Sequence, residues 1–209
     1  MTAVVLACGV PAEHPDWHDM PAIPGKSDLD PVLTAGPGRI VVVGSDASLA
    51  AVVLRLVRTE RLDRVVGFVP VGTSAAATVW GLPRRRADAL ELALTGEPGR
   101  LPVVRDDSGG VLVGRGTAGP VDGEAYCDDW LALRGRARRI EVTPDPAGGV
   151  VGQVRRGRLR RVEVFRGRAF QLGCHPATVV HDGVPHPRPV TRWTWYRHTE
   201  DLRAVALPG

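Results

Sequence analysis

Two strand-like segments, each followed by a turn of small residues and a helix-like segment, constrain this sequence more than any other feature. The first is Ile40-Val41-Val42-Val43, which runs into Gly44-Ser45-Asp46-Ala47-Ser48. The second spans residues 65–71 and runs into Gly72-Thr73-Ser74. Runs of β-branched residues are typical of strands buried on both faces of a sheet, and Ser or Asp after such a strand favours a helix N-terminus. Because helix N-termini attract anions, both turns are candidate phosphate-binding segments.

The segments around these turns predict an α/β lobe. Residues 48–60 place five apolar side chains on one helical stripe: Leu49, Val52, Val53, Leu56 and Val57. Further helices are expected over residues 74–80 and 86–94, and a first strand over residues 1–8. Residues 9–38 are rich in Pro, Asp and Gly, so we expect a long irregular connection with one short helix near residues 27–33.

Beyond Gly99 the pattern changes to short strands separated by Gly-containing turns, which predicts an all-β lobe. We expect strands over residues 101–104, 111–114, 137–143, 150–154, 159–165, 169–172, 178–181 and 202–206. The shift in composition at residues 95–99 places the boundary between an α/β lobe of residues 1–95 and a β-sandwich lobe of residues 96–209.

Composition limits the function classes. The 209 residues carry a formal net charge of +4, but 23 acidic residues largely offset the arginines, so we expect no nucleic-acid partner. Cys8, Cys127 and Cys174 lie far apart without CxxC spacing, which argues against a zinc site or a disulfide framework and favours a cytoplasmic location. No apolar run approaches the length of a transmembrane helix, so any contact with the inner face of a membrane would be peripheral.

The order of these motifs resembles the diacylglycerol kinase and bacterial lipid kinase family, which is related to the NAD kinases. That family carries Gly-Gly-Asp-Gly-Thr after one strand and Pro-Leu-Gly-Thr-Gly/Ala-Asn after the next. Here the first motif reads Gly44-Ser45-Asp46-Ala47-Ser48, and the second keeps Pro70, Gly72 and Thr73. The family's strand and Asp-Gly-Glu turn match residues 179–184, with Asp182 and Gly183 in place. The resemblance implies a Rossmann-like lobe followed by a β-sandwich.

The resemblance also implies a site and its cofactors. Nucleotide contacts would fall on Gly44, Ser45, Asp46, Ala47, Ser48, Gly72, Thr73 and Ser74, and Asp182 would be the general base. ATP and Mg²⁺ would be the cofactors of an active enzyme, although the residues do not indicate which groups would hold the metal. Phosphoryl transfer depends mainly on such positioning and on charge neutralisation.

Several positions depart from the family pattern. Ser45 and Ala47 replace glycines, Ala75 stands where Asn is usual, and Val184 replaces the second carboxylate of Asp-Gly-Glu. Two function classes therefore remain. The chain is either a lipid kinase that phosphorylates a lipid hydroxyl, with weak or lost activity, or a non-catalytic relative that binds a nucleotide, lipid or protein. Asp182-Gly183 taken alone is also a common hairpin turn.

Other candidate residues have simpler interpretations beside their functional ones. Asp122-Gly123-Glu124 is expected at a hairpin tip, and His175, His181, His186 and His198 lack a regular metal-ligand spacing. The arginine-rich run 155–161 could contact anionic lipid headgroups or form the solvated face of a hairpin. Trp193, Trp195 and Tyr196 could form a membrane-contacting surface, a subunit surface in a homo-oligomer, or part of the core, and we expect at least one tryptophan to pack in the core.

Overall fold

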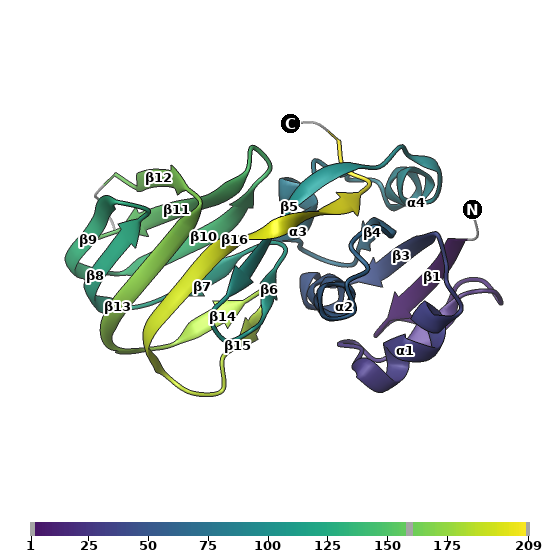
Figure 1. Ribbon diagram of the computed structural model, residues 1–209, viewed down its shortest axis with the longest axis horizontal. Coiled ribbons are helices and arrows are strands. Elements are labelled where there is room, and N and C mark those ends of the chain that lie inside the picture. Colours follow the sequence, from purple (N-terminus) through teal and green to yellow (C-terminus); the bar gives the residue numbers. More distant parts are fainter. Residues whose placement is uncertain (1–2, 158–160, 208–209) are drawn as a thin grey trace. The chain divides into compact units, whose positions relative to one another are not determined.

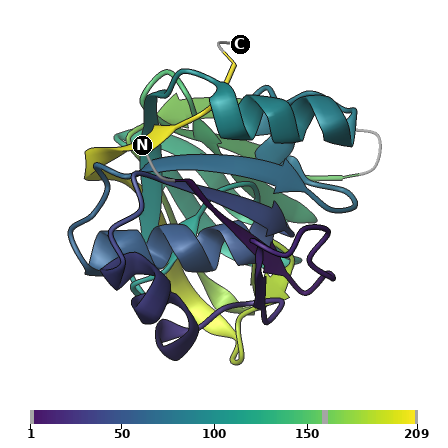
Figure 2. The same cartoon turned by 90° about the vertical axis from the view of Figure 1, so that its right-hand side faces the viewer.

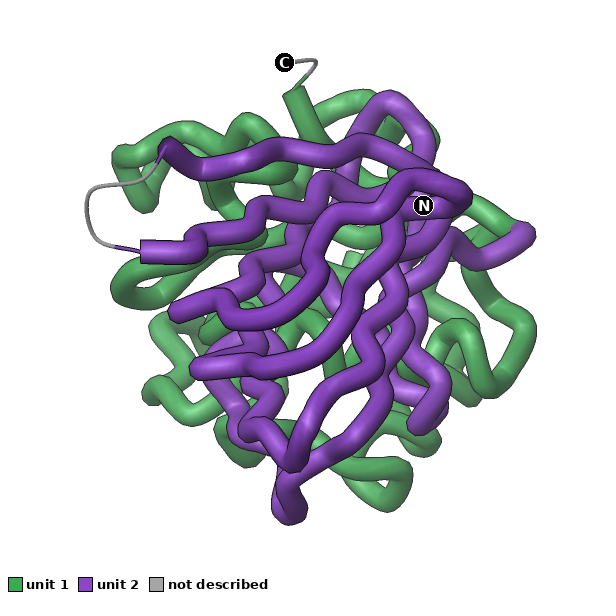
Figure 3. Tube along the Cα trace, turned by 90° about the vertical axis from the view of Figure 1, so that its left-hand side faces the viewer, with its two compact units in different colours: residues 1–101, 200–209 green, residues 102–199 purple. Residues whose placement is uncertain are grey.

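The computed structural model describes residues 3–157 and 161–207, and the chain forms two compact units (Figure 3). The first unit contains residues 1–101 and 200–209, and the second contains residues 102–199. The sequence-based boundary fell between residues 95 and 96 and left the C-terminal residues in the second lobe. The structure instead returns the last ten residues to the first unit, because the end of the last strand pairs there with a parallel strand.

The first unit is built on a parallel sheet with the strand order β2-β1-β3-β4-β16. Figure 1 labels β1, β3 and β4 of this sheet. Its strands are β1 (Ala3–Cys8), β2 (His18–Met20), β3 (Arg39–Gly44), β4 (Val65–Pro70) and the C-terminal end of β16 (Val190–Ala204). The helices are α1 (Lys26–Thr34), α2 (Asp46–Arg58), α3 (Ala75–Val79) and α4 (Arg86–Thr95). The predicted α/β lobe is confirmed, and β2 is a strand inside the interval that we expected to be irregular.

Helices cover both faces of this parallel sheet, with α4 on one face and α2 on the other (Figure 2). The predicted apolar stripe of α2 is buried at Leu49, Val52, Val53 and Leu56. The face that carries Val41, Val43 and Val69 packs with Ala89 and Ala93 of α4. Coverage on both faces explains why β3 reads as a continuous apolar run rather than as an alternating pattern.

The strands of the second unit belong to two sheets: the antiparallel part of a ten-stranded sheet, whose parallel strands are those described above, and a separate six-stranded antiparallel sheet. One sheet has the order β16-β13-β8-β9 and the other has the order β12-β11-β10-β7-β14-β15. The strand bounds are β5 (Gly99–Asp106), β6 (Val111–Leu112), β7 (Gly116–Ala118), β8 (Val121–Cys127), β9 (Trp130–Ala137), β10 (Arg139–Asp145), β11 (Gly149–Arg155), β12 (Glu163–Gly167), β13 (Ala169–Ala177), β14 (Val179–His181) and β15 (Val184–Pro185).

Side chains from both sheets share one apolar core, which confirms the predicted β-sandwich lobe. Phe170 and Trp195 of one sheet pack in the same cluster as Ile140, Val154 and Val179 of the other. The core interpretation of the tryptophans is also confirmed, since Trp193 is 4% and Trp195 0% exposed.

The segment Asp122-Gly123-Glu124 is not a hairpin tip, as we had predicted from its sequence. It lies in the middle of β8, which pairs with both β9 and β13. Val121, Ala125 and Cys127 of this strand are buried. Asp122 and Glu124 instead form ion pairs of 2.9 Å with Arg136 and Arg134 of β9. The two polar side chains and the intervening glycine hid the alternating pattern of a strand from sequence analysis.

Two further expectations concern membrane-spanning helices and the arginine-rich run at residues 155–161. None of the helices within residues 3–157 and 161–207 is long and apolar enough to cross a bilayer. The expected strand over residues 159–165 is partly replaced by β12, which begins at Glu163, and residues 158–160 of the arginine-rich run lie outside the described residues.

Candidate functional site

The two turns expected to bind phosphate lie side by side at the carboxyl ends of β3 and β4. These strands pair in parallel, with Gly44 opposite Pro70, and the N–H of Val71 donates a 2.8 Å hydrogen bond to the carbonyl of Gly44. Carboxyl ends of adjacent parallel strands are where open α/β sheets bind ligands. The predicted juxtaposition of the two turns is therefore present within the first unit.

Asp46 links the two turns through its carboxylate. Its Oδ2 accepts hydrogen bonds from the backbone N–H groups of Ala75, at 2.8 Å, and Ala76, at 3.2 Å. The hydroxyl of Ser74 donates to Oδ1 of the same carboxylate and accepts from the N–H of Ala77 at 2.8 Å. The first N–H groups of α3, which directly follow the predicted nucleotide-binding turn at residues 72–74, thus have an anionic partner inside the chain.

The turn after β3 is also closed by its own side chains. The N–H of Ser48 donates to Oγ of Ser45 at 3.2 Å, and the N–H of Ser45 donates to Oγ of Ser48 at 3.1 Å. This is a capping box that satisfies the N-terminus of α2. Ser48 is fully buried, and its hydroxyl donates to the carbonyl of Ala22 at 2.7 Å. Ser45 and Ser48 therefore stabilise the start of the helix.

Gly44 is needed for packing. A Cβ at this position would lie 2.7 Å from Oγ of Ser48 and 3.0 Å from Cβ of Cys8. Gly72 differs, because its φ of +78° requires glycine while a Cβ there would meet nothing within 4 Å. Ala47 is half-buried, and Gly72 and Thr73 are exposed in the turn before α3.

These contacts make the site a poor fit for the phosphates of ATP, the cofactor that the resemblance implies. A phosphate at a helix N-terminus needs free N–H donors and a positive local field. The side chains of Ser45 and Asp46 accept hydrogen bonds from the N–H groups of Ser48, Ala75 and Ala76, and the Asp46 carboxylate adds a negative charge at the same place. The N–H groups of Ser48, Ala75 and Ala76 at this corner therefore already have acceptors within the protein.

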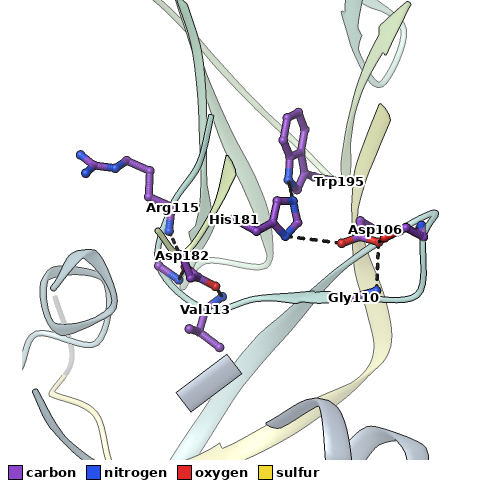
Figure 4. Close-up of polar contacts among 9 residues, drawn as sticks. Asp106, Gly110, Val113, Arg115, His181, Asp182 and Trp195 are labelled. Carbon is purple, nitrogen blue, oxygen red and sulfur yellow. Dashed lines mark hydrogen bonds and ion pairs between the residues drawn. The ribbon is translucent and has the colours of Figure 1, made fainter. Parts of the chain in front are cut away.

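Asp182 lies at the tip of the β14–β15 hairpin in the second unit, where its φ of +46° and the +86° of Gly183 fit a tight turn. Its side chain accepts hydrogen bonds from three successive backbone N–H groups, those of Val113 at 3.0 Å, Gly114 at 2.8 Å and Arg115 at 2.9 Å (Figure 4). The residue is 8% exposed. The hairpin interpretation of the sequence is confirmed, while the role of general base stays a prediction.

His181 precedes Asp182 and belongs to a buried polar cluster that sequence analysis missed (Figure 4). The indole N–H of Trp195 donates to Nε2 of His181 at 2.6 Å, and Nδ1 lies 3.4 Å from Oδ2 of Asp106. Because an indole nitrogen is only a donor, Nε2 must carry no proton and the neutral ring carries its proton on Nδ1, facing Asp106. Burial lowers the pKa of His181, against an opposing effect of the Asp106 charge, and nearby His186 lowers it further.

Asp106 is held in turn by the residues after it. Its Oδ1 accepts hydrogen bonds from the N–H and hydroxyl of Ser108, at 2.8 and 2.6 Å, and from the N–H of Gly110 at 2.9 Å. An Asp followed two residues later by Ser is a recognisable sequence signal for such a turn. Its pairing with a histidine 75 positions further along the chain has no comparable local signal.

Other candidate chemistries find little support in the part of the chain that the structure describes. There, no group of three or more His, Cys, Asp or Glu side chains is arranged to hold a metal ion. Burial raises the pKa of Cys8 to about 12 and that of Cys127 to about 11, and it also raises the pKa of Cys174. The three free thiols are therefore poor nucleophiles at neutral pH.

Comparison with known proteins identifies structural relatives. The sequence matches no protein-family model and no curated protein. The structure is similar to that of a diacylglycerol kinase from Bacillus anthracis str. Sterne, with a TM-score of 0.73 and 12% identity over 99% of this chain and 97% of that chain. It is also similar to an NAD kinase from Archaeoglobus fulgidus in complex with ATP, with a TM-score of 0.55 and 13% identity over 96% of this chain and 92% of that chain. Both chains are matched over nearly their full length, and the chain has the fold of the diacylglycerol kinases and NAD kinases.

Proposed function

We propose that this chain is a non-catalytic relative of the diacylglycerol kinases, which keeps their fold to bind a lipid or a protein and does not transfer phosphoryl groups. The observation that carries the proposal is the Asp46 carboxylate, which accepts from the N–H groups of Ala75 and Ala76. These donors lie at the corner where the family resemblance assigns the nucleotide. Because Asp46 is the acidic residue that this turn shares with the family motif, the proposal rests on its contact together with the departures at Ser45, Ala47 and Ala75.

The sequence departures at the same corner support this proposal. Ser45 replaces a glycine of the family motif and serves as the N-cap of α2. Ala47 replaces another glycine, and Ala75 provides no side-chain amide beside the turn. The changes are consistent with one another, because each favours helix capping or burial over the close approach of a ligand to the backbone.

The alternative function is a lipid kinase in which Asp182 is the general base. One observation favours it: the carboxylate of Asp182 is buried and is held in one orientation by three backbone N–H groups. The same arrangement also serves as a turn-stabilising contact between the β14–β15 hairpin and residues 113–115, and the non-catalytic proposal assigns it that role.

The test is a lipid phosphorylation assay with radiolabelled ATP, Mg²⁺ and diacylglycerol in mixed micelles. We expect no phosphorylated lipid above background from the wild-type protein at any enzyme concentration. The proposal fails if product forms in proportion to protein and is lost in Asp182→Asn while remaining in the control Glu97→Gln. Glu97 is an exposed acidic residue of the first unit. Circular dichroism would show that both variants are folded.

A further inference from the structure

The second unit is much more basic than the first. Residues 102–199 contain 16 arginines and 10 acidic residues, a formal net charge of +6. Residues 1–101 and 200–209 contain 11 basic and 13 acidic residues, a formal net charge of −2. The small net charge of the whole chain thus hides a strongly positive β-sandwich. Such a charge distribution attracts anionic partners to the positive part.

Five of these arginines gather where β9 leads into β10 and where β11 ends, and we call this group the arginine corner: Arg136, Arg138, Arg139, Arg155 and Arg156. The antiparallel register places Arg139 directly opposite Arg155. The N–H of Arg138 donates to the carbonyl of Arg155 at 2.8 Å, so the backbones at these positions are fixed against each other. Like charges directly opposite each other on neighbouring strands destabilise a sheet.

Internal carboxylates balance only part of this charge. Arg136 pairs with Asp122 at 2.9 Å, Arg139 with Glu141 at 3.3 Å and Arg156 with Glu163 at 2.8 Å. Within residues 3–157 and 161–207, Arg138 and Arg155 form no ion pair, and both are exposed. Two positive charges of the corner therefore have no counter-ion in the described part of the protein.

Two hollows lie against the arginine corner. One, of about 420 Å³, is lined by Arg138 and Arg139 together with Thr117 and Thr178. The other, of about 500 Å³, is lined by Arg138, Arg136, Arg156 and His175, together with Asp122, whose carboxylate pairs with Arg136. Pro120 and Arg138 line both hollows, so the two form neighbouring compartments on either side of these residues. Guanidinium groups and hydroxyls are suitable hydrogen-bond donors for phosphate oxygens.

The backbone around the hollows is held closely together. Gly119 has a φ of +152°, and a Cβ there would lie 2.6 Å from the carbonyl oxygen of Arg138. The N–H of Gly119 donates to the carbonyl of Thr178 at 3.4 Å. The turn between β7 and β8 is therefore pressed against the start of β10 and the start of β14. A fixed backbone reduces the entropy lost when side chains projecting from it order around a ligand.

We propose that the arginine corner binds an anion that carries phosphate groups, with Arg138 shared between the two hollows. The unpaired charges of Arg138 and Arg155 supply the attraction, and the forked guanidinium groups match phosphate geometry. The phosphate is either part of a soluble polyphosphorylated molecule or the headgroup of an anionic phospholipid. This site uses no residue of the turns at positions 44–48 and 72–74, so it goes beyond the proposed function and stands without it.

The test measures binding of sodium triphosphate by isothermal titration calorimetry and binding to sedimenting vesicles of phosphatidylcholine with and without phosphatidylglycerol. The variant is Arg138→Gln/Arg155→Gln. The matched control is Arg84→Gln/Arg100→Gln, which removes two charges from exposed arginines of the first unit. We expect the corner variant to lose about tenfold or more in affinity and the control to stay within about twofold. Hydrogen bonds that involve charged groups are stronger than those between neutral groups.

The two arms distinguish the sources of phosphate. Triphosphate binding that depends on the corner identifies a soluble ligand, and vesicle binding that depends on both the corner and phosphatidylglycerol identifies a headgroup. Either result supports the proposal. Absence of both, or an equal loss in the corner variant and the control, would overturn it.

A thermal measurement separates loss of the site from misfolding. Because the corner variant removes like-charge repulsion, we expect it to unfold at the same temperature as the wild type, or higher, in low salt without anions. A bound ligand stabilises the folded state by mass action. Whichever phosphate probe binds should therefore raise the unfolding temperature of the wild type and of the control, but not that of the corner variant. A similar rise in all three proteins would contradict the proposal.

Discussion

Among single residues, Asp46 is central to the proposed function because its side chain joins two turns. Its carboxylate lies in the first turn of α2 and also contacts the first N–H groups of α3. An acidic residue at a helix N-terminus stabilises that helix. Here the same charge lies in the first turn of α2 and occupies the N–H groups of Ala75 and Ala76 at the start of α3.

We expect Asp46→Ala to lower the free energy of unfolding by about 1–2 kcal/mol, which is the usual cost of losing a helix cap. Urea denaturation of the wild type and the variant measures the difference. Glu97→Ala is the control, because it removes an exposed carboxylate and should change stability by less than about 0.5 kcal/mol. A variant at position 46 as stable as the control would contradict the capping role.

His181 should make stability depend on pH. The unfolded histidine has a pKa of about 6.5, and burial lowers the pKa in the folded protein. As the pH falls below about 6.5, the unfolded state takes up the proton first, so the contribution of His181 is complete above that pH and decreases below it. The slope from one proton cannot exceed about 1.4 kcal/mol per pH unit. Asp106 opposes the effect and His186 adds to it.

Urea midpoints at pH 8 and pH 5.5 measure this dependence. His181→Gln keeps an acceptor for the indole N–H of Trp195 and should show a smaller loss of stability at pH 5.5 than the wild type does. His14→Gln changes an exposed histidine and should retain the full loss. If the wild type and the position 181 variant lose the same amount, another group is responsible.

Among the elements, the strand–turn–helix units of the first unit were the easiest to predict. A buried apolar run, a small-residue turn and a periodic stripe are local signals, and β3, α2, β4 and α4 follow them closely. The strand β8 was missed because Asp122 and Glu124 read as a polar turn until Arg136 and Arg134 of β9 are placed beside them. A pairing between strands has no signal within either strand alone.

In the candidate site, too, the positions of the turns could be predicted from local sequence, but the contacts between distant residues could not. Sequence analysis identified the turns at 44–48 and 72–74 and the turn at Asp182, and their positions in the elements agree with the structure. It could not predict that Asp46 would turn toward Ala75 and Ala76, because that contact depends on how α2 and α3 start relative to each other. Asp106 and His181 were missed as a pair for a similar reason.

Gly44 and Gly72 were both expected to be phosphate-loop glycines, but the structure requires glycine at the two positions for different reasons. We expect Gly44→Ala to cost about 1–3 kcal/mol, because its Cβ would overpack Ser48 and Cys8. Gly72→Ala should cost only about 1 kcal/mol, since it strains φ in open space. Chemical denaturation of both variants shows which substitution lowers the free energy of unfolding more. A smaller cost at position 44 than at position 72 would contradict the packing argument.

For the chain as a whole, the structural comparisons establish the fold of the diacylglycerol kinases and NAD kinases, and the loss of kinase chemistry is our proposal from the contacts at one corner. The fold is shared with chains that are only 12–13% identical, so the architecture has been kept while the residues have changed. Function depends on specific sites within a fold rather than on the fold itself. In this protein the corner at β3 and β4 is closed by Asp46, and the exposed positive charge lies on the β-sandwich.

The most direct test is a crystal structure of the protein grown with millimolar Mg²⁺ and a non-hydrolysable ATP analogue. The account predicts that the Asp46 carboxylate stays on the N–H groups of Ala75 and Ala76 and that no phosphate contacts residues 44–48 or 72–74. Phosphate oxygens bound to those N–H groups, with the side chain of Asp46 turned away, would contradict it.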